Sequence, residues 1–95
     1  KSTAMVTNPT HVAIALLYDE QKVPLPVLTA KGEGPIAQRM MKAAREAKVP
    51  IVENVWLARS LYQEVPPNHY LPREFIPAVA EVLKWVREQK EKGNL

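Results

Sequence analysis

The sequence contains no cysteine, few aromatic residues and no long run of apolar residues. Without cysteine the chain forms neither a disulfide framework nor a thiolate metal site, which suits the reducing cytosol. Its longest apolar run, Val12 to Tyr18, is far shorter than the ~20 residues that a membrane-spanning helix needs. Composition therefore predicts a globular domain in which nothing crosses a membrane.

The sequence also lacks the length for more than one hydrophobic core. Its 95 residues are 46% hydrophobic and 24% charged, which is ordinary for one small globular domain that folds alone. The first residue is Lys1 and not a methionine, so we expect the chain to be a piece of a longer protein. The segment before Lys1 could be membrane-embedded.

A strongly basic surface is missing too. Thirteen Lys and Arg against ten Asp and Glu give a net charge of +3, and much of the excess alternates with acidic residues, as in 87–92. That alternation is typical of a solvated helix face. We therefore expect no nucleic-acid partner.

Apolar spacing predicts seven elements in the order β-β-β-α-β-α-α. Strands are expected at 3–7, 12–18, 27–30 and 49–52, and helices at 35–47, 54–62 and 74–91. The first two strands should be antiparallel, and a helical crossover should make the third and fourth strands parallel. The fold class is α/β: a single small domain with a mixed four- to five-stranded sheet flanked by helices.

Local signals set the expected boundaries of these elements. Lys31 to Gly34 should break the chain before the first helix, Asn54 should cap the second helix, and 65–71 should form a loop. The apolar stripes of these two helices include Ile36 and Val55, which we expect to be buried.

Three features are candidates for binding sites. Gly32-Glu33-Gly34 before a helix could cradle a phosphate, although the segment is acidic and the phosphate-loop pattern is incomplete. His11 and His69 lack metal-ligand spacing, so we expect no metal and no cofactor. Trp56 and Trp85 are expected to be packing residues, with a partner contact as the alternative for one of them.

An enzyme that acts on external substrates is poorly supported. Ser2 and Ser60 are the only serines and lie outside any GxSxG setting, and no paired carboxylates lie near a histidine in sequence. Two other functions remain open: a non-cleaving structural interaction module in which Asn8–Pro9 is an inert turn, and a small phosphate-binding α/β domain.

The Asn8–Pro9 pair has a chemical possibility of its own. An asparagine ordinarily cyclises through the following backbone nitrogen, but Pro9 has no N–H and its ring closes off that route. In the reverse reaction the Asn8 side-chain nitrogen attacks the Asn8 backbone carbonyl, closes a five-membered succinimide and expels the Pro9 nitrogen. Nucleophile and electrophile belong to one residue, so proximity costs almost no translational freedom. The chain would be cut after Asn8.

Thr10 and His11 are candidates for the rest of that chemistry. A neutral amide is a weak nucleophile and needs a proton acceptor, and histidine exchanges protons near neutral pH. His11 is the only nearby side chain suited to that task. Thr10 and the N–H groups of the turn could stabilise the oxyanion or fix the turn.

The tetrapeptide Asn8-Pro9-Thr10-His11, between a short strand and an apolar strand, resembles the NPTH motif of the cytoplasmic domain in the FlhB/YscU/SpaS family of type III secretion export proteins. The resemblance continues in family order at four further segments: 25–28, 48–53, 57–62 and 78–85. Together they cover nearly the whole chain, and the combination is highly specific for the family.

This resemblance implies that residues 1–95 form an autocleaving cytoplasmic switch domain, preceded by a four-helix membrane domain and a linker. Cleavage between Asn8 and Pro9 would leave the two fragments associated, with Thr10 and His11 shaping the loop. The implied function is a switch in export order at the cytoplasmic face of the bacterial inner membrane. Early substrates (rod, needle or hook) would give way to later ones (translocators, effectors or filament).

The implied partners are other export-gate proteins, the length-control (ruler) protein, secretion substrates or their chaperones, and the domain's own cleaved N-terminal fragment. The reaction would be a single intramolecular turnover. Val23-Pro24-Leu25-Pro26 and His69-Tyr70-Leu71-Pro72 resemble the virulence branch, and Ala30-Lys31-Gly32 resembles the flagellar branch. On balance these segments favour the injectisome.

Overall fold

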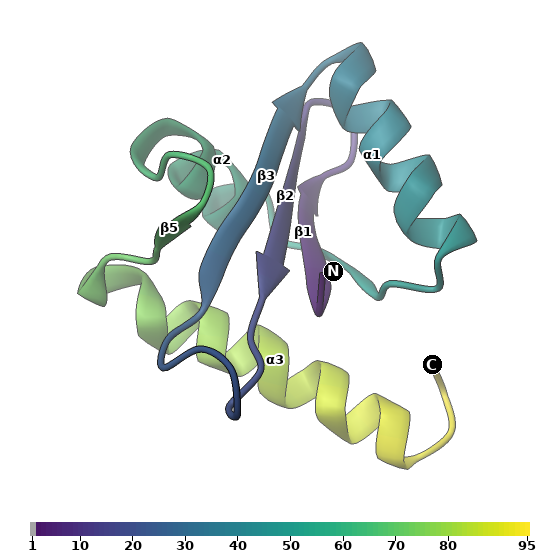
Figure 1. Ribbon diagram of the computed structural model, residues 1–95. Helices are drawn as coiled ribbons and strands as arrows, with labels where there is room; N and C mark the ends of the chain where they lie inside the picture. The colour runs from purple at the N-terminus through teal and green to yellow at the C-terminus, as the bar shows by residue number, and fades with distance from the viewer. Residues whose placement is uncertain (1) are drawn as a thin grey trace.

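A five-stranded mixed sheet with helices on both faces forms the structure, a computed structural model that describes residues 2–95 (Figure 1). The strands are β1 (Ala4–Asn8), β2 (Val12–Leu17), β3 (Val27–Glu33), β4 (Ile51–Glu53) and β5 (His69–Tyr70). The helices are α1 (Pro35–Glu46), α2 (Val55–Glu64) and α3 (Ile76–Glu91), with a 3₁₀ turn at Arg73–Phe75. The predicted α/β class is confirmed, and the short β5 adds a strand between the last two helices.

The strand order β4-β1-β2-β3-β5 places β1 and β2 inside the sheet. These two strands are antiparallel, as predicted, with Val6 opposite Ile14 and Asn8 opposite Val12. The predicted pairing of the third and fourth strands is wrong, because β4 pairs in parallel with β1. β5 pairs with the outer edge of β3. β4 therefore takes the remaining edge of β1, and the α1 crossover passes over two strands.

Side chains alternate between the two faces of the sheet, so the domain has two cores. The core beneath α2 and α3 holds mainly branched and aromatic side chains: Val6, Val12, Ile14, Leu16, Leu28, Leu57, Ala58, Leu61, Val65, Leu71, Phe75, Val79 and Val82. The core beneath α1 holds only alanine and methionine: Met5, Ala13, Ala15, Ala37, Met41 and Ala44. β2 contributes to both cores, as its continuous apolar run predicts.

The predicted break at Lys31–Gly34 is wrong for its first three residues, because β3 continues through Glu33. Gly32 permits this continuation: a Cβ atom there would lie 2.5 Å from the Ile36 side chain and 2.8 Å from the Met40 sulfur. A missing side chain thus lets the strand pass close beneath α1.

The predicted loop 65–71 is also interrupted, since His69 and Tyr70 pair with Leu28 and Val27 as β5. Asn68 just before them has a φ of 65°, and its N–H donates to the Leu28 carbonyl at 2.6 Å. This left-handed residue turns the chain onto the edge of the sheet.

Some apolar side chains expected to be packed lie on the surface. Ile36 and Val55 are 52% and 42% exposed. In the first turns of α1 and α2 it is their neighbours Ala37 and Leu57 that enter the cores. Trp56 and Trp85 are 65% and 44% exposed, so neither belongs to a core.

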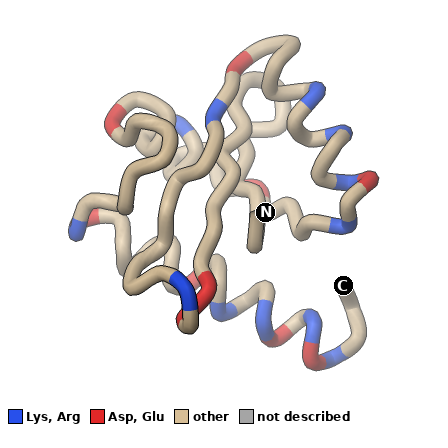
Figure 2. Tube along the Cα trace, in the orientation of Figure 1, with Lys and Arg blue, Asp and Glu red and all other residues tan. Residues whose placement is uncertain are grey.

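Charged residues occur mostly in the helices and loops, and β1 and β2 contain none (Figure 2). Within residues 2–95, every helix is too short or too polar to span a lipid bilayer.

Candidate functional site

Asn8, Pro9, Thr10 and His11 form the turn between β1 and β2 (Figure 1). Asn8 ends β1 and is only 7% exposed, whereas the three residues after it are exposed. Because Asn8 lies opposite Val12, only three residues connect the two strands. All four predicted site residues therefore lie together in one tight turn that begins in the protein interior.

The His11 backbone N–H donates to the Asn8 backbone carbonyl at 2.9 Å and closes the turn. This carbonyl is the electrophile of the predicted self-cleavage. Its oxygen becomes negative when a nucleophile adds to the carbonyl carbon, and a donor already aimed at that oxygen stabilises the charge without reorganisation. The turn thus contains one hydrogen-bond donor, the His11 N–H, that is already placed to stabilise an oxyanion at Asn8.

The Thr10 hydroxyl and the His11 ring are also in contact, with Oγ1 and Nδ1 2.6 Å apart. When Nδ1 carries the ring proton and donates it to Thr10, Nε2 is left as a free proton acceptor. Thr10 can therefore stabilise the His11 tautomer that a general base requires.

Two groups at the start of α1 hold the turn from outside. The Gly34 N–H donates to the His11 carbonyl at 2.9 Å, and the Gln38 side-chain amide donates to the Pro9 carbonyl at 3.0 Å. The sequence pointed to neither contact. Gln38 has the pattern of any solvated helix residue, and its role depends on how α1 is placed against the turn.

Asn54 anchors the other side of the turn. Its N–H donates to the Thr7 carbonyl at 2.9 Å, directly before Asn8 in the chain. Its side chain accepts a hydrogen bond from the Leu57 N–H at 3.1 Å, which confirms the predicted cap of α2. The end of β1 is therefore fixed by α2 as well as by β2.

A hollow of about 150 Å³ lies beside the turn. It is lined by the turn, β3 and α2 through His11, Val12, Glu33, Arg59, Tyr62 and Gln63. Partial burial, and then the Glu33 carboxylate, raise the pKa of the Tyr62 hydroxyl above its ordinary 10.0, so Tyr62 is neutral at physiological pH. The hollow has room for a few water molecules next to His11.

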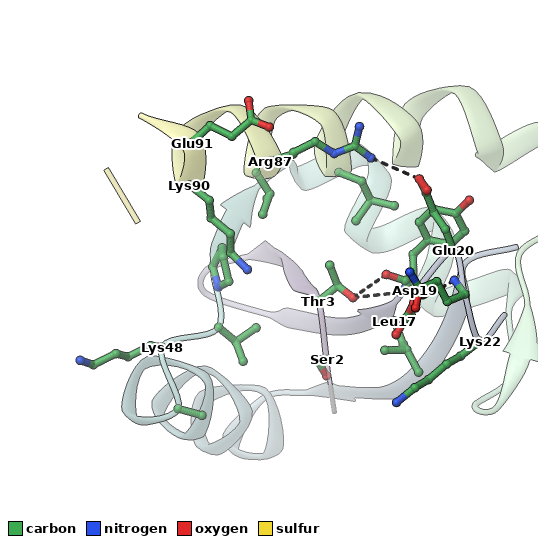
Figure 3. Close-up of a pocket in the computed structure, with 17 residues that line it drawn as sticks. Ser2, Thr3, Leu17, Asp19, Glu20, Lys22, Lys48, Arg87, Lys90 and Glu91 are labelled. Atoms are coloured by element: carbon green, nitrogen blue, oxygen red, sulfur yellow. Dashed lines mark hydrogen bonds and ion pairs between the residues drawn. The ribbon is translucent and has the colours of Figure 1, made fainter. Parts of the chain in front are cut away.

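The larger groove of the molecule lies at the opposite end of β1 (Figure 3). Its volume is about 1070 Å³. It is bordered by Ser2 and Thr3 just before β1, the Asp19–Lys22 loop, the 47–50 segment and the C-terminal half of α3. At its floor, Thr3 Oγ1 donates to the Tyr18 carbonyl at 3.1 Å. No residue of the turn Asn8 to His11 lines this groove, so it is separate from the candidate site.

The glycine-containing segment before α1 has its own structural contacts. Gly34 has a φ of 58° and gives its N–H to His11, while Gly32 lies within β3. A phosphate cradle would need such N–H groups for itself. Across residues 2–95, no three His, Cys, Asp or Glu side chains are grouped as metal ligands.

Comparison with known proteins adds a family to this geometry. A sequence profile described as the FlhB HrpN YscU SpaS Family matches residues 1–86. Flagellar biosynthetic protein FlhB of Bacillus subtilis is 45% identical over 92 residues, which cover 97% of this chain and 26% of that protein. Yop proteins translocation protein U of Yersinia pestis is 44% identical over 89 residues, which cover 94% and 25%. The chain thus spans about a quarter of the length of these curated relatives.

Solved structures agree with the sequence matches. The cytoplasmic domain of FlhB from Shewanella putrefaciens superposes with a TM-score of 0.89 at 33% identity, covering 98% of this chain and 73% of that one. An EscU C-terminal domain with an asparagine-to-aspartate mutation superposes with a TM-score of 0.88 at 35% identity, covering 90% and 92%. Other EscU C-terminal domains have alanine for that asparagine, alanine for the proline after it, threonine for an arginine or aspartate for a tyrosine.

Proposed function

The chain belongs to the FlhB/HrpN/YscU/SpaS family of type III export proteins, and from this premise we propose that it is a domain that cleaves itself between Asn8 and Pro9. The cut would serve to switch export from early to later substrates. The observation that carries the proposal is the hydrogen bond from the His11 N–H to the Asn8 carbonyl, 2.9 Å long.

The positions mutated in EscU support Asn8–Pro9 as the site. It is the only asparagine–proline pair in this sequence, and the EscU mutations include an asparagine and the proline that follows it. The mutated arginine and tyrosine of EscU follow that asparagine at the same separations at which Arg59 and Tyr62 follow Asn8. Both of these residues line the hollow beside His11.

In the proposed reaction, Asn8 Nδ2 attacks the Asn8 backbone carbon and gives one proton to His11 Nε2. The carbonyl oxygen becomes negative and is stabilised by the His11 N–H. When the carbonyl re-forms, the bond to the Pro9 nitrogen breaks. That nitrogen takes the proton from His11 Nε2 and becomes a secondary amine, which returns the His11 ring to its neutral form. Water from the hollow then opens the succinimide and leaves a carboxylate at the end of the first fragment.

The cut would leave β1 in the sheet. β1 is paired with β2 from Ala4 to Asn8 and with β4 from Met5 to Thr7, and its side chains are buried on both faces. The proposed product is a nicked, folded domain whose surface changes only around residues 9–11. Such a local change of surface can alter which partner binds without dismantling the domain.

Relatives from the flagellar and the Yop systems are similar to nearly the same degree, 45% and 44% identical. The proposed function is therefore the one common to both systems, and the preference for the injectisome remains a prediction from sequence. The proposed partners are export-gate proteins, the ruler protein and secretion substrates or their chaperones. The proposed location is the cytoplasmic face of the inner membrane.

The intact mass of the denatured chain tests self-cleavage. Wild type is expected to give one fragment ending at Asn8 and one starting at Pro9. Asn8→Ala should remain whole because it has no nucleophile, and Asn94→Ala, an exposed asparagine near the C-terminus, should cleave like wild type. A wild-type chain that stays at full length for days at neutral pH rejects the proposal in favour of a structural interaction module.

A further inference from the structure

We propose that Gln38 is a positioning residue for the cleavage turn, an inference that rests on the self-cleavage proposed above. Its side-chain Nε2 donates to the Pro9 carbonyl at 3.0 Å. Pro9 is the leaving residue of the reaction. The contact therefore joins α1 to the far side of the bond that breaks.

The backbone of a proline has one free torsion, because its ring fixes φ near −65°. The remaining torsion, ψ, sets the direction of the proline carbonyl. By holding the Pro9 carbonyl, Gln38 restrains that last torsion and with it the orientation of the leaving residue. Small displacements from a productive geometry slow reactions of this kind strongly, so the restraint should raise the cleavage rate.

Gln38 acts together with Gly34, one helical turn earlier. The Gln38 N–H donates to the Gly34 carbonyl at 3.1 Å, and the Gly34 N–H holds the His11 carbonyl at 2.9 Å. The first turn of α1 therefore holds the carbonyls on both sides of Thr10. Carbonyl oxygens are favoured there because the helix N-terminus carries partial positive charge.

Gln38 is exposed to solvent, so its substitution should affect the turn and leave the cores intact. Gln38→Leu removes the donor and keeps a side chain of similar length. Cleavage is timed by intact mass after cell-free synthesis, and stability is measured by urea unfolding of an Asn8→Ala background. We expect cleavage about two- to tenfold slower, the range of one hydrogen bond, with an unchanged urea midpoint.

Lys42→Leu is the matched control, an exposed residue one turn further along α1 with the same replacement. It should cleave at the wild-type rate. Comparing Gln38→Leu with Lys42→Leu separates the effect of losing the Pro9 contact from any general effect that a leucine on the surface of α1 has on the cleavage rate.

The pH dependence of cleavage in Gln38→Glu distinguishes a hydrogen-bond donor at this position from a residue that only supports the fold. An ionised glutamate only accepts hydrogen bonds, whereas a protonated one donates. The cleavage rate relative to wild type at the same pH should therefore be lowest near pH 7 and recover as the pH falls towards ~4.3, where glutamate protonates. Circular dichroism at each pH verifies that both chains remain folded.

The outcomes separate the two proposals. Gln38→Leu cleaving as fast as wild type, or a Gln38→Glu ratio that is independent of pH, overturns the role of Gln38 and leaves self-cleavage standing. A wild-type chain that does not cleave overturns the proposed function itself.

Discussion

The two connections of β2 are held in different ways. The turn before it, Pro9 to His11, is bound by α1 at the first and last carbonyl and closes onto Asn8. The loop after it is held mainly from within: the N–H groups of Lys22 and Val23 both donate to the Asp19 carbonyl, at 2.9 and 2.8 Å. Both connections contain proline. The Pro26 carbonyl, at the end of the second connection, accepts from the Leu71 N–H at 3.1 Å. Among residues 2–95, only the first connection has a proline carbonyl held by a helix, that of Pro9 by Gln38 of α1.

From this contrast we infer what a reactive asparagine–proline bond would need beyond its two residues. The dipeptide alone is a common turn former. In the β1–β2 turn, three donors hold the three carbonyls around the bond: the His11 N–H, the Gly34 N–H and the Gln38 side-chain amide. In the Asp19–Pro26 loop, the exposed ion pair from Glu20 to Arg87, at 3.9 Å, contributes little rigidity. We therefore expect an asparagine–proline bond to be cleaved only where donors outside the dipeptide hold the carbonyls around it.

The largest effect in this comparison is expected for His11→Ala, which removes the proposed base and keeps the backbone donor. Cleavage should slow by about a hundredfold without being abolished. The wild-type rate should also fall in acid, because a protonated ring cannot accept a proton, and the variant rate should not depend on pH. Timed intact-mass measurements at several pH values check both.

His69→Ala is the control for that experiment, since His69 is the other histidine and lies exposed in β5. It should cleave like wild type. If His11→Ala keeps the wild-type rate and pH profile, His11 is not the base. The mechanism then consists of Asn8 and the turn geometry alone.

A smaller effect is expected for Gly34→Ala. The φ of 58° and ψ of −134° at Gly34 form a conformation that residues other than glycine rarely adopt, while nothing lies within 4 Å of an added Cβ. The cost of the substitution is therefore torsional and on the order of 1–3 kcal/mol. Urea unfolding measures the loss of stability, and cleavage should slow a few-fold as the hold of α1 on His11 loosens.

Gly93→Ala is its counterpart, because Gly93 has a φ of 78° and equally open surroundings beyond the end of α3. The chain end can rearrange there, so global stability and cleavage should hardly change. Equal losses in stability and rate for the two variants would contradict a specific role of Gly34 in the turn.

No effect on cleavage is expected for Val23→Asn, which places an asparagine directly before Pro24 in the other connection. The new pair should stay uncut because no helix holds its carbonyls. Intact mass would reveal a fragment that starts at Pro24. Such a fragment would show that an asparagine–proline dipeptide is enough for cleavage. The contacts that distinguish the two connections would then have no effect on the cleavage rate.

Much of the fold follows from repeated apolar spacing, and the parts that do not are set by single contacts. The α/β order and the β1–β2 hairpin are confirmed, because the helices carry periodic apolar patterns and β2 is a continuous apolar run. β5 has no such pattern: its two exposed residues pair because Asn68 turns the chain at a φ of 65°. The partner of β4 depends on which sheet edge remains free, which no local segment encodes.

The candidate site divides in the same way. The four residues of the motif are adjacent in sequence, so their joint location was predictable. The donor to the Asn8 carbonyl and the contact from Gln38 were not, because the first depends on turn torsions and the second on how α1 crosses the sheet. Sequence thus predicted which bond reacts, and the three-dimensional structure showed which groups contact the turn around it.

The position of β1 between β2 and β4 has a mechanical consequence. After a cut at Asn8, residues up to that point are held by hydrogen bonds on both edges of one strand. A pull on β1 along its own axis loads the bonds of both ladders together in shear, whereas an edge strand peeled sideways would lose them one at a time. A domain cut at Asn8 would therefore still transmit tension from β1 to β2 and β4, through the hydrogen bonds on both edges of β1.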